Sequence, residues 1–143
     1  MDIVNSKTRS TMMAGIKNKN TQPEKLLRSY LHHSGFRFRI HGKNLPGKPD
    51  IILPRYQAVI LVHGCFWHGH GCHLFKWPAT RKEFWREKIE GNCKRDTKNI
   101  NELKKMGWRV AVLWECELRE KDWKTTGSRE LIKWLKEMKN LAY

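Results

Sequence analysis

The chain has no long hydrophobic run: none of its stretches approaches the roughly 18 apolar residues that a membrane-spanning helix requires. Residues 1–7 also lack the apolar centre of a secretion signal. Cysteine is scarce, with four in the chain, and in a chain without such a signal clustered cysteines favour metal binding over disulfides. We therefore expect a cytoplasmic protein of bacterial type with reduced thiols.

Acidic residues are few. The sequence has 14 Asp and Glu against 29 Lys and Arg, which gives a formal net charge of +15. This excess favours a polyanionic partner, with nucleic acid ahead of an anionic membrane and of a merely solvated basic surface. Seven tryptophans accompany the charge, and such rings can stack on bases or wedge between them. The composition thus predicts a nucleic-acid-binding protein.

The chain contains no repeats, low-complexity tracts or linkers, and its 143 residues fit one domain. We predict a polar, basic arm over residues 1–20 and a single domain over residues 21–143. Capping-box patterns at Thr21–Glu24 and Thr80–Glu83 predict the starts of two helices. Hydrophobic patterning and turn residues predict a third helix and four strands, over 130–139, 36–40, 51–53, 58–62 and 109–114. The order predicts an α/β fold, a mixed central sheet flanked by helices on both faces, with 109–114 as a buried central strand.

Residues 63–72 read His-Gly-Cys-Phe-Trp-His-Gly-His-Gly-Cys and are the most informative segment of the chain. Cys65, His70 and Cys72 are soft ligands at a spacing suited to a tetrahedral zinc. The glycines between them let the loop fold around an ion. His63 and His68 are left for proton chemistry. We expect the active site here, on a loop stiffened by a metal.

A closed structural zinc needs a fourth ligand. Cys116 follows the predicted strand 109–114, so its thiol can meet a loop that also leaves a strand end. His73 is a weaker candidate for the same place. Cys93 lies inside the second predicted helix and is expected to be a packed free thiol.

Asp50 follows Pro49 at the head of a predicted strand. In isolation it reads as a turn residue, but hairpin pairing with Val59–His63 would bring its carboxylate near His63. Carboxylate oxygens suit Mg²⁺, and a carboxylate, a divalent ion and two imidazoles are the parts needed for water attack on a phosphodiester. By default Glu24 is a capping residue and Asp96 is a solvated charge.

Four motifs occur in order: Leu45–Asp50, Val62–His68, Pro78–Arg81 and Trp108–Cys116. With them the chain resembles the very short patch repair endonucleases, from about residue 8 to about residue 118. The resemblance implies a restriction-endonuclease-like fold for the endonuclease domain and a DNA-contacting role for the arm over residues 1–20. It also implies Mg²⁺-dependent nicking of one DNA strand 5′ to the thymine of a T:G mismatch, which arises when 5-methylcytosine deaminates. Such a nick initiates very short patch repair.

The resemblance also implies roles for individual residues. Asp50 and the backbone carbonyl of Val62 would bind the catalytic Mg²⁺. The other catalytic positions would be His63, His68, Glu24 and Asp96, the last as an orienting partner. The structural zinc would be bound by Cys65, His70, Cys72 and Cys116. The DNA-wedging aromatics would be Phe66 and Trp67, with Trp85 in support.

The chain departs from the broader nuclease superfamily, which has an acidic residue and a lysine where Leu61 and His63 stand. Three alternatives are a non-catalytic zinc-stabilised DNA-binding module, a nuclease of the His-Asn-His type and an RNA-processing enzyme. The second would need an asparagine and another histidine on a following helix, which the sequence does not offer. We expect a monomer that acts on double-stranded DNA, with other mismatch-repair proteins as further candidate partners.

Overall fold

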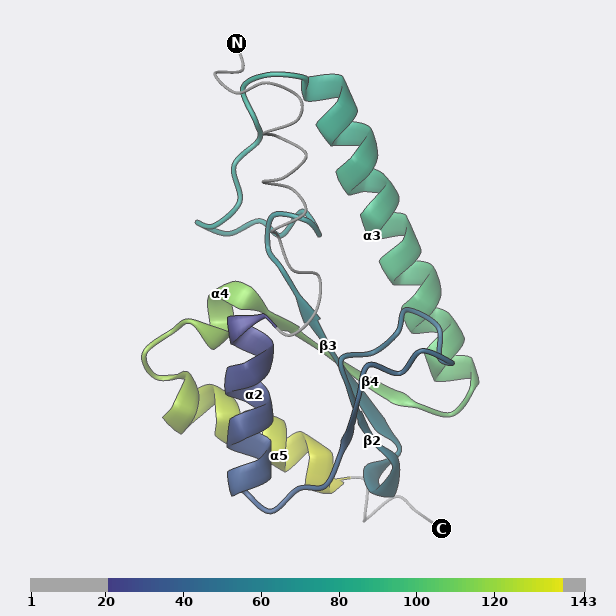
Figure 1. Cartoon of the computed structure of the whole chain (residues 1–143), viewed down its shortest axis with the longest axis vertical. Helices are drawn as coiled ribbons and strands as arrows, with labels where there is room; N and C mark the ends of the chain where they lie inside the picture. Colours follow the sequence, from purple (N-terminus) through teal and green to yellow (C-terminus); the bar gives the residue numbers. More distant parts are fainter. Residues whose placement is uncertain (1–20, 138–143) are drawn as a thin grey trace.

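The computed structural model describes residues 21–137, so the predicted arm over residues 1–20 and the end of the predicted last helix lie outside the described residues. The helices and strands form a mixed α/β arrangement (Figure 1). The helices are α2 (Gln22–His33), α3 (Lys82–Lys105), α4 (Glu115–Leu118) and α5 (Ser128–Glu137). The strands are β1 (Arg39–Ile40), β2 (Ile51–Leu53), β3 (Ala58–His63) and β4 (Arg109–Trp114). Two further turns are the 3-10 helix η1 (Pro54–Tyr56) and the π-helix η2 (Trp123–Gly127).

The four strands form one mixed sheet in the order β1-β2-β3-β4. The first two pairings are antiparallel, and β3 pairs with β4 in parallel, with Ile60 opposite Ala111. The predicted mixed sheet is therefore present. The prediction that residues 109–114 form a buried central strand was wrong, because β4 lies at the edge of the described sheet and is half-buried along its whole length. The apolar residues of β4 pack against helices on both faces of the sheet. An apolar run in a sequence does not show how many strands lie beside the strand that contains it.

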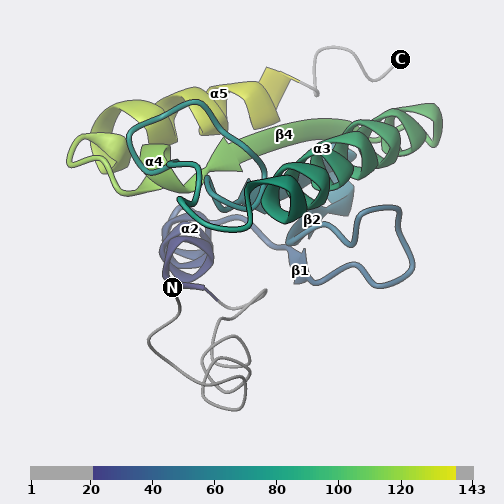
Figure 2. The ribbon, with the colours of Figure 1, turned by 90° about the horizontal axis from the view of Figure 1, so that it is seen from above.

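Helices cover both faces of the sheet, as predicted. Successive side chains of a strand point to opposite faces, so Ile51 and Ile60 face one layer while Ile52 and Val59 face the other. The larger core joins the first face to α2, α4 and α5 through Leu27, Leu31, Leu118, Leu131 and Leu135. On the second face, Leu103 of α3 packs against Ile52 and Val59. Figures 1 and 2 show α3 on one side of the sheet and α2 and α5 on the other.

The two predicted helix starts had different outcomes. Thr21 caps α2 as predicted, since its side-chain oxygen accepts the N–H of Glu24 at 3.4 Å. The predicted cap at Thr80 was wrong: Arg81 precedes α3 with φ of 54° and makes no capping hydrogen bond with its side chain. A residue that caps a helix with its side chain has an extended backbone. Arg81, the residue before α3, has a left-handed backbone instead. Gly91 does not interrupt α3.

The predicted hairpin is confirmed, with β2 and β3 joined through η1. The strand predicted over 36–40 is reduced to Arg39–Ile40, because Phe36 turns into the core instead of pairing along the sheet. The last helix was predicted to begin at Glu130, and α5 begins two residues earlier at Ser128. Neither α4 nor η2 was predicted.

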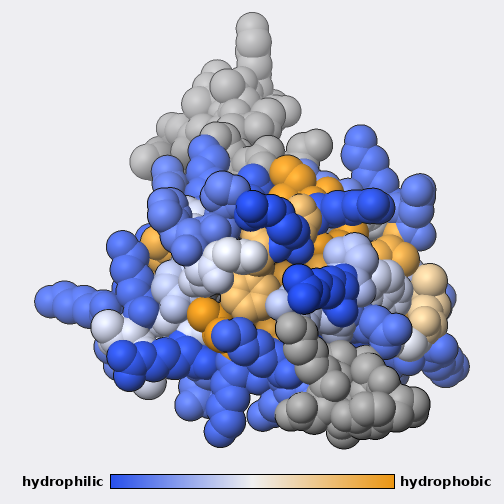
Figure 3. All heavy atoms as spheres, turned by 90° about the horizontal axis from the view of Figure 1, so that it is seen from below, coloured by the Kyte–Doolittle hydropathy of each residue, from blue (hydrophilic) through white to orange (hydrophobic). Residues whose placement is uncertain are grey.

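The surface fits the composition. On the face drawn in Figure 3, hydrophilic residues surround smaller hydrophobic areas. Among the helices of the described part, none is long and apolar enough to cross a membrane.

Candidate active site

Asp50 lies where the start of β2 meets the end of β3. Its backbone N–H donates to the carbonyl of Ile60 at 3.1 Å, and its carboxylate Oδ2 accepts the backbone N–H of Val62 at 2.6 Å. The pKa of Asp50 is raised to about 7, mainly by burial and also by the nearby charge of Glu24. The Val62 hydrogen bond and the charge of Arg28 act in the opposite direction and are included in this value. The hairpin therefore brings together the two residues predicted to bind one metal ion.

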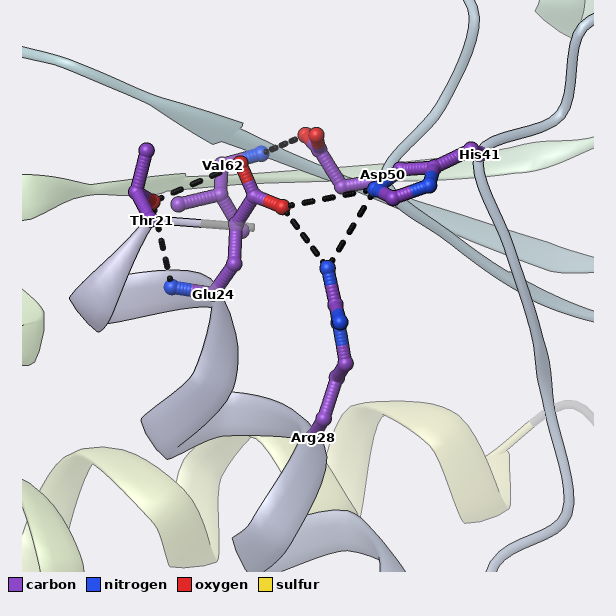
Figure 4. Close-up of polar contacts among 6 residues, drawn as sticks. All are labelled: Thr21, Glu24, Arg28, His41, Asp50 and Val62. Carbon is purple, nitrogen blue, oxygen red and sulfur yellow. Dashed lines mark hydrogen bonds and ion pairs between the residues drawn. The ribbon is translucent and has the colours of Figure 1, made fainter. Parts of the chain in front are cut away.

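Glu24 is 2% exposed and belongs to a polar cluster beside Asp50 (Figure 4). Its Oε2 lies 3.0 Å from Nη2 of Arg28 and 3.7 Å from Nε2 of His41. Its other oxygen, Oε1, accepts the hydroxyl of Thr21 at 3.4 Å. The carboxylate thus faces the helix cap and the site at once, which reconciles the capping role with a place in the site.

The two predicted catalytic histidines are stacked on each other. His63 ends β3 and His68 lies in the following loop, with ring centroids 3.9 Å apart and planes at 2°. Asp96, from α3, places Oδ2 at 2.5 Å from Nδ1 of His68. Burial, and then the proximity of His68, lowers the pKa of His63 to about 4. Asp96 is therefore a partner of His68 and not merely a solvated charge.

The four predicted zinc ligands come together. The donor atoms of Cys65, His70, Cys72 and Cys116 all lie within 4.8 Å of one another. The backbone N–H of Cys116 donates to Sγ of Cys65 at 3.3 Å, and its own Sγ lies 3.5 Å from Nδ1 of His70. The prediction that the strand end would deliver Cys116 to the loop is confirmed, while the competing His73 is exposed and outside this group.

Cys93 behaves as a packed thiol, since its Sγ donates to the backbone carbonyl of His68 at 3.3 Å. This contact joins α3 to the loop that carries His68 and the cluster residues Cys65, His70 and Cys72. The described part of the chain contains no disulfide at any of its cysteines.

The three aromatics predicted to wedge into DNA are in mutual contact. Phe66 meets Trp67 at 5.2 Å and Trp85 at 5.4 Å between centroids, and the two tryptophans are 5.9 Å apart. Asn92 of α3 donates to the carbonyl of Trp67 at 2.8 Å and ties this part of the loop to the helix. Phe66 and Trp67 of the loop therefore form one aromatic cluster with Trp85 of α3.

Sequence reasoning missed three residues of the site. Trp114 stacks on His70 at 4.0 Å and meets His63 edge-on at 5.2 Å, so one ring contacts both clusters. Its place in the motif before Cys116 was a signal of its importance but not of these contacts. Arg28 follows Glu24 by four residues, a spacing that favours an ion pair on a helix. No sequence signal links Arg28 or Glu24 to His41, the third residue that was missed.

Comparison with known proteins agrees with this geometry. The model of the family described as DNA mismatch endonuclease Vsr matches residues 1–74, about half of the chain. The chain belongs to the Vsr family. It is 48% identical over 121 residues to the DNA mismatch endonuclease Vsr of Escherichia coli (strain K12), covering 85% of this chain and 78% of that protein. It is also 49% identical over 119 residues to the type II nicking enzyme V.XorIIP of Xanthomonas oryzae pv. oryzae, covering 83% of this chain and 88% of that enzyme. As a member of this family, the chain is a DNA endonuclease, a hydrolase of phosphodiester bonds.

The Cys/His group and the carboxylates at Asp50 and Glu24 suit different ions. Three thiols and one imidazole within a single 4.8 Å group fit a tetrahedral zinc. The carboxylate of Asp50 is partly buried and has a raised pKa, and it lies near a second carboxylate, that of Glu24; a hard divalent cation would offset both charges. Within residues 21–137, the buried Nδ1 of His63 has no hydrogen-bond partner, which leaves it for a water or a substrate atom at this site.

Proposed function

We propose that this Vsr-family endonuclease nicks one strand of duplex DNA 5′ to the thymine of a T:G mismatch and so initiates very short patch repair. The proposal depends above all on one observation: the Asp50 carboxylate is held at Val62 of β3, and the last residue of that strand, His63, stacks on His68. That arrangement supplies a carboxylate for a metal and two imidazoles for protons. The two relatives described above are a mismatch endonuclease and a nicking enzyme, and their names support the same reaction.

The proposed cofactors are a catalytic Mg²⁺ and a structural Zn²⁺. The Asp50 carboxylate and the backbone carbonyl of Val62 would hold the Mg²⁺, and the zinc would be held by Cys65, His70, Cys72 and Cys116. When bound, Mg²⁺ would polarise the scissile phosphate and stabilise the leaving oxygen. The zinc would keep the loop rigid and would take no part in bond breaking.

His68 is the proposed acceptor of the proton of the attacking water. Since its Nδ1 faces Asp96, its Nε2 is the ring nitrogen left for the water. The partner of its ring is Asp96, whereas Glu24 contacts Arg28 and His41. His63 is neutral at physiological pH because its pKa is lowered, so it can accept a hydrogen bond from a second water.

Recognition of DNA would divide between charge and aromatic rings. The surplus of lysine and arginine would neutralise phosphates, a sequence-independent and salt-dependent contribution. Phe66 and Trp67, supported by Trp85, would wedge beside the mismatch, where unstacking costs less than in a paired duplex. This difference would favour damaged sites.

The remaining parts of the proposal concern organisation. We assign a restriction-endonuclease-like fold to a single endonuclease domain over residues 21–143 and a DNA-contacting role to residues 1–20. The protein would act as a monomer on cytoplasmic DNA. The mixed sheet with helices on both faces supports the fold assignment.

A strand-nicking assay tests the proposal. Duplexes with either strand end-labelled would carry T:G or T:A at one position, each with Mg²⁺ or with EDTA. We expect a single nick 5′ to the mismatched thymine, and only in the reaction that contains both the T:G duplex and Mg²⁺. Cutting of T:A at the same rate, or of single-stranded RNA in preference to DNA, would overturn the assignment of substrate. No nick on any substrate would favour a DNA-binding module.

A further inference from the structure

The cluster around Glu24 contains two residues to which the proposed chemistry gives no role. Nη2 of Arg28 donates to the Glu24 carboxylate at 3.0 Å and lies 3.2 Å from Nε2 of His41 (Figure 4). The same imidazole nitrogen lies 3.7 Å from the carboxylate. Arg28 and His41 therefore contact each other and the same oxygen of Glu24 from two different segments of the chain.

His41 has an unusual backbone. Its φ is 53°, in the left-handed region that residues other than glycine rarely adopt. Its N–H donates to the carbonyl of Asp50 at 3.2 Å, and the next residue, Gly42, pairs with Pro49 at 2.9 Å. The strained residue is thus fixed directly beside the metal-binding Asp50, and its side chain reaches across to α2. Such strain persists where the surrounding structure imposes it, and it often accompanies function.

The charges in the cluster explain why such fixing is needed. Glu24 and Asp50 are both carboxylates in a largely buried region, and the charge of Glu24 helps to raise the pKa of Asp50. A mobile Glu24 would relieve this repulsion by turning away from Asp50. The Arg28 guanidinium offsets the carboxylate charges, and the charge-assisted hydrogen bond from its Nη2 to Oε2 of Glu24 restricts the orientation of that carboxylate.

We propose that Arg28 and His41 are positioning residues that hold the Glu24 carboxylate beside Asp50 in the geometry needed for phosphodiester hydrolysis. The inference rests on the proposed function, in which Glu24 and Asp50 belong to one site. It contrasts with a simple surface ion pair on α2, which contributes little to stability and nothing to catalysis.

The first test is a double-mutant cycle between Arg28 and Glu24. Under single-turnover conditions with saturating Mg²⁺ and T:G duplex, we expect Arg28→Met to slow nicking by about ten- to hundred-fold, the usual effect of losing a group that orients a metal-site carboxylate. In a Glu24→Gln background the same substitution should have no further effect, because Arg28 acts through Glu24. Arg28→Lys should recover part of the rate. Lys25→Met, which removes an equal charge from the exposed side of α2, is the matched control and should leave the rate unchanged.

The second test separates positioning from folding. His41→Gly removes the imidazole while glycine adopts the left-handed backbone freely, so the thermal midpoint without metal should not fall. Nicking should nevertheless slow, with the affinity for the T:G duplex unchanged. Gln57→Gly is the matched control, because Gln57 also has a positive φ, 48°, and lies in the turn between β2 and β3. It should keep both the midpoint and the rate.

A third readout does not depend on activity. Mg²⁺ raises the unfolding midpoint of a protein that binds it in the folded state, and we expect this shift to be smaller in Arg28→Met than in Lys25→Met. The inference is overturned if Arg28→Met and His41→Gly nick at the rate of their controls, or if the effects of Arg28→Met and Glu24→Gln simply add. An unsubstituted protein that nicks no T:G duplex would instead defeat the proposed function, so the two failures are distinguishable.

Discussion

The carboxylate of Asp96 lies 2.5 Å from Nδ1 of His68, although the two residues are 28 positions apart and come from a helix and a loop. Because of this contact, Nδ1 of the imidazole is bonded to Asp96, and Nε2 is the nitrogen left for a water molecule. The contact also ties α3 to the loop that carries Cys65, His70 and Cys72, close to the contact between Cys93 and the His68 backbone. The orientation of the histidine is therefore set by a helix that does not carry it.

Asp96→Asn should slow nicking of a T:G duplex by about ten- to hundred-fold, because the amide cannot stabilise the protonated imidazole and only weakly fixes its tautomer. The affinity for the duplex should not change, since Asp96 faces His68. Glu87→Gln is the control, as Glu87 is an exposed acid on the same helix. Rate and affinity, measured separately by single-turnover nicking and by duplex binding, check the prediction. Equal rates for the two variants would contradict it.

Asp50 should make the metal-free protein less stable as pH rises. Its pKa is about 7 when folded against an ordinary 3.8, so the folded state binds the proton more tightly. The contribution to stability is therefore fully present below about pH 4 and is lost as pH rises through about 7. His63 acts in the opposite sense: its contribution is present above pH 6.5 and is lost as pH falls through about 4.

The difference between the wild type and Asp50→Asn isolates the contribution of Asp50. The asparagine still accepts the N–H of Val62, so the fold should persist, while nicking is lost and T:G binding is kept. Denaturant unfolding without metal from pH 4 to pH 8 should show the wild type losing stability relative to the variant. Adding Mg²⁺ at pH 8 should restore the wild type and leave the variant unaffected. Full nicking by the variant would remove Asp50 from the mechanism.

Cys116→Ser should reduce zinc content and lower the thermal midpoint. A serine hydroxyl is a poor zinc ligand, and the remaining three donors leave the site open. Zinc per protein, measured by atomic emission, and thermal unfolding together check this expectation. His73→Ala is the control and should retain its zinc, because His73 is exposed and outside the group of four. Retention of zinc by Cys116→Ser with loss in His73→Ala would reverse the assignment of the fourth ligand.

The local features of the site could be predicted from sequence because each depends on short spacing. Ligands at Cys65, His70 and Cys72 lie within one loop, and pairing across the hairpin necessarily brings Asp50 near the end of β3. The place of Cys116 followed from strand direction, since β3 and β4 run in parallel and end at the same edge.

What could not be predicted depends on packing between distant segments. The edge position of β4 is one example, and Arg109 is another: its guanidinium donates to the carbonyls of Trp134 and Leu135 near the end of α5 at 2.8 and 3.0 Å. Neither partner has a sequence signal that points to Arg109. The orientation of Glu24 by His41 is of the same kind, because it requires a left-handed residue in a loop packed against α2.

Trp67→Ala should slow the nicking of a T:G duplex more than the nicking of a T:A duplex, and so reduce the preference for T:G. If the ring stacks in the duplex beside the mismatch, its loss removes roughly 1–3 kcal/mol per stacked base, or about ten- to hundred-fold in discrimination. Trp77→Ala is the control: Trp77 is 54% exposed on the same segment, and its ring contacts Phe75 and not Trp67. The ratio of single-turnover rates on the two duplexes should fall in the first variant and stay constant in the second. Because Trp67 also packs against Trp85, thermal midpoints of both variants are needed, and an equal fall in both rates with a lowered midpoint would assign the ring to folding instead of recognition.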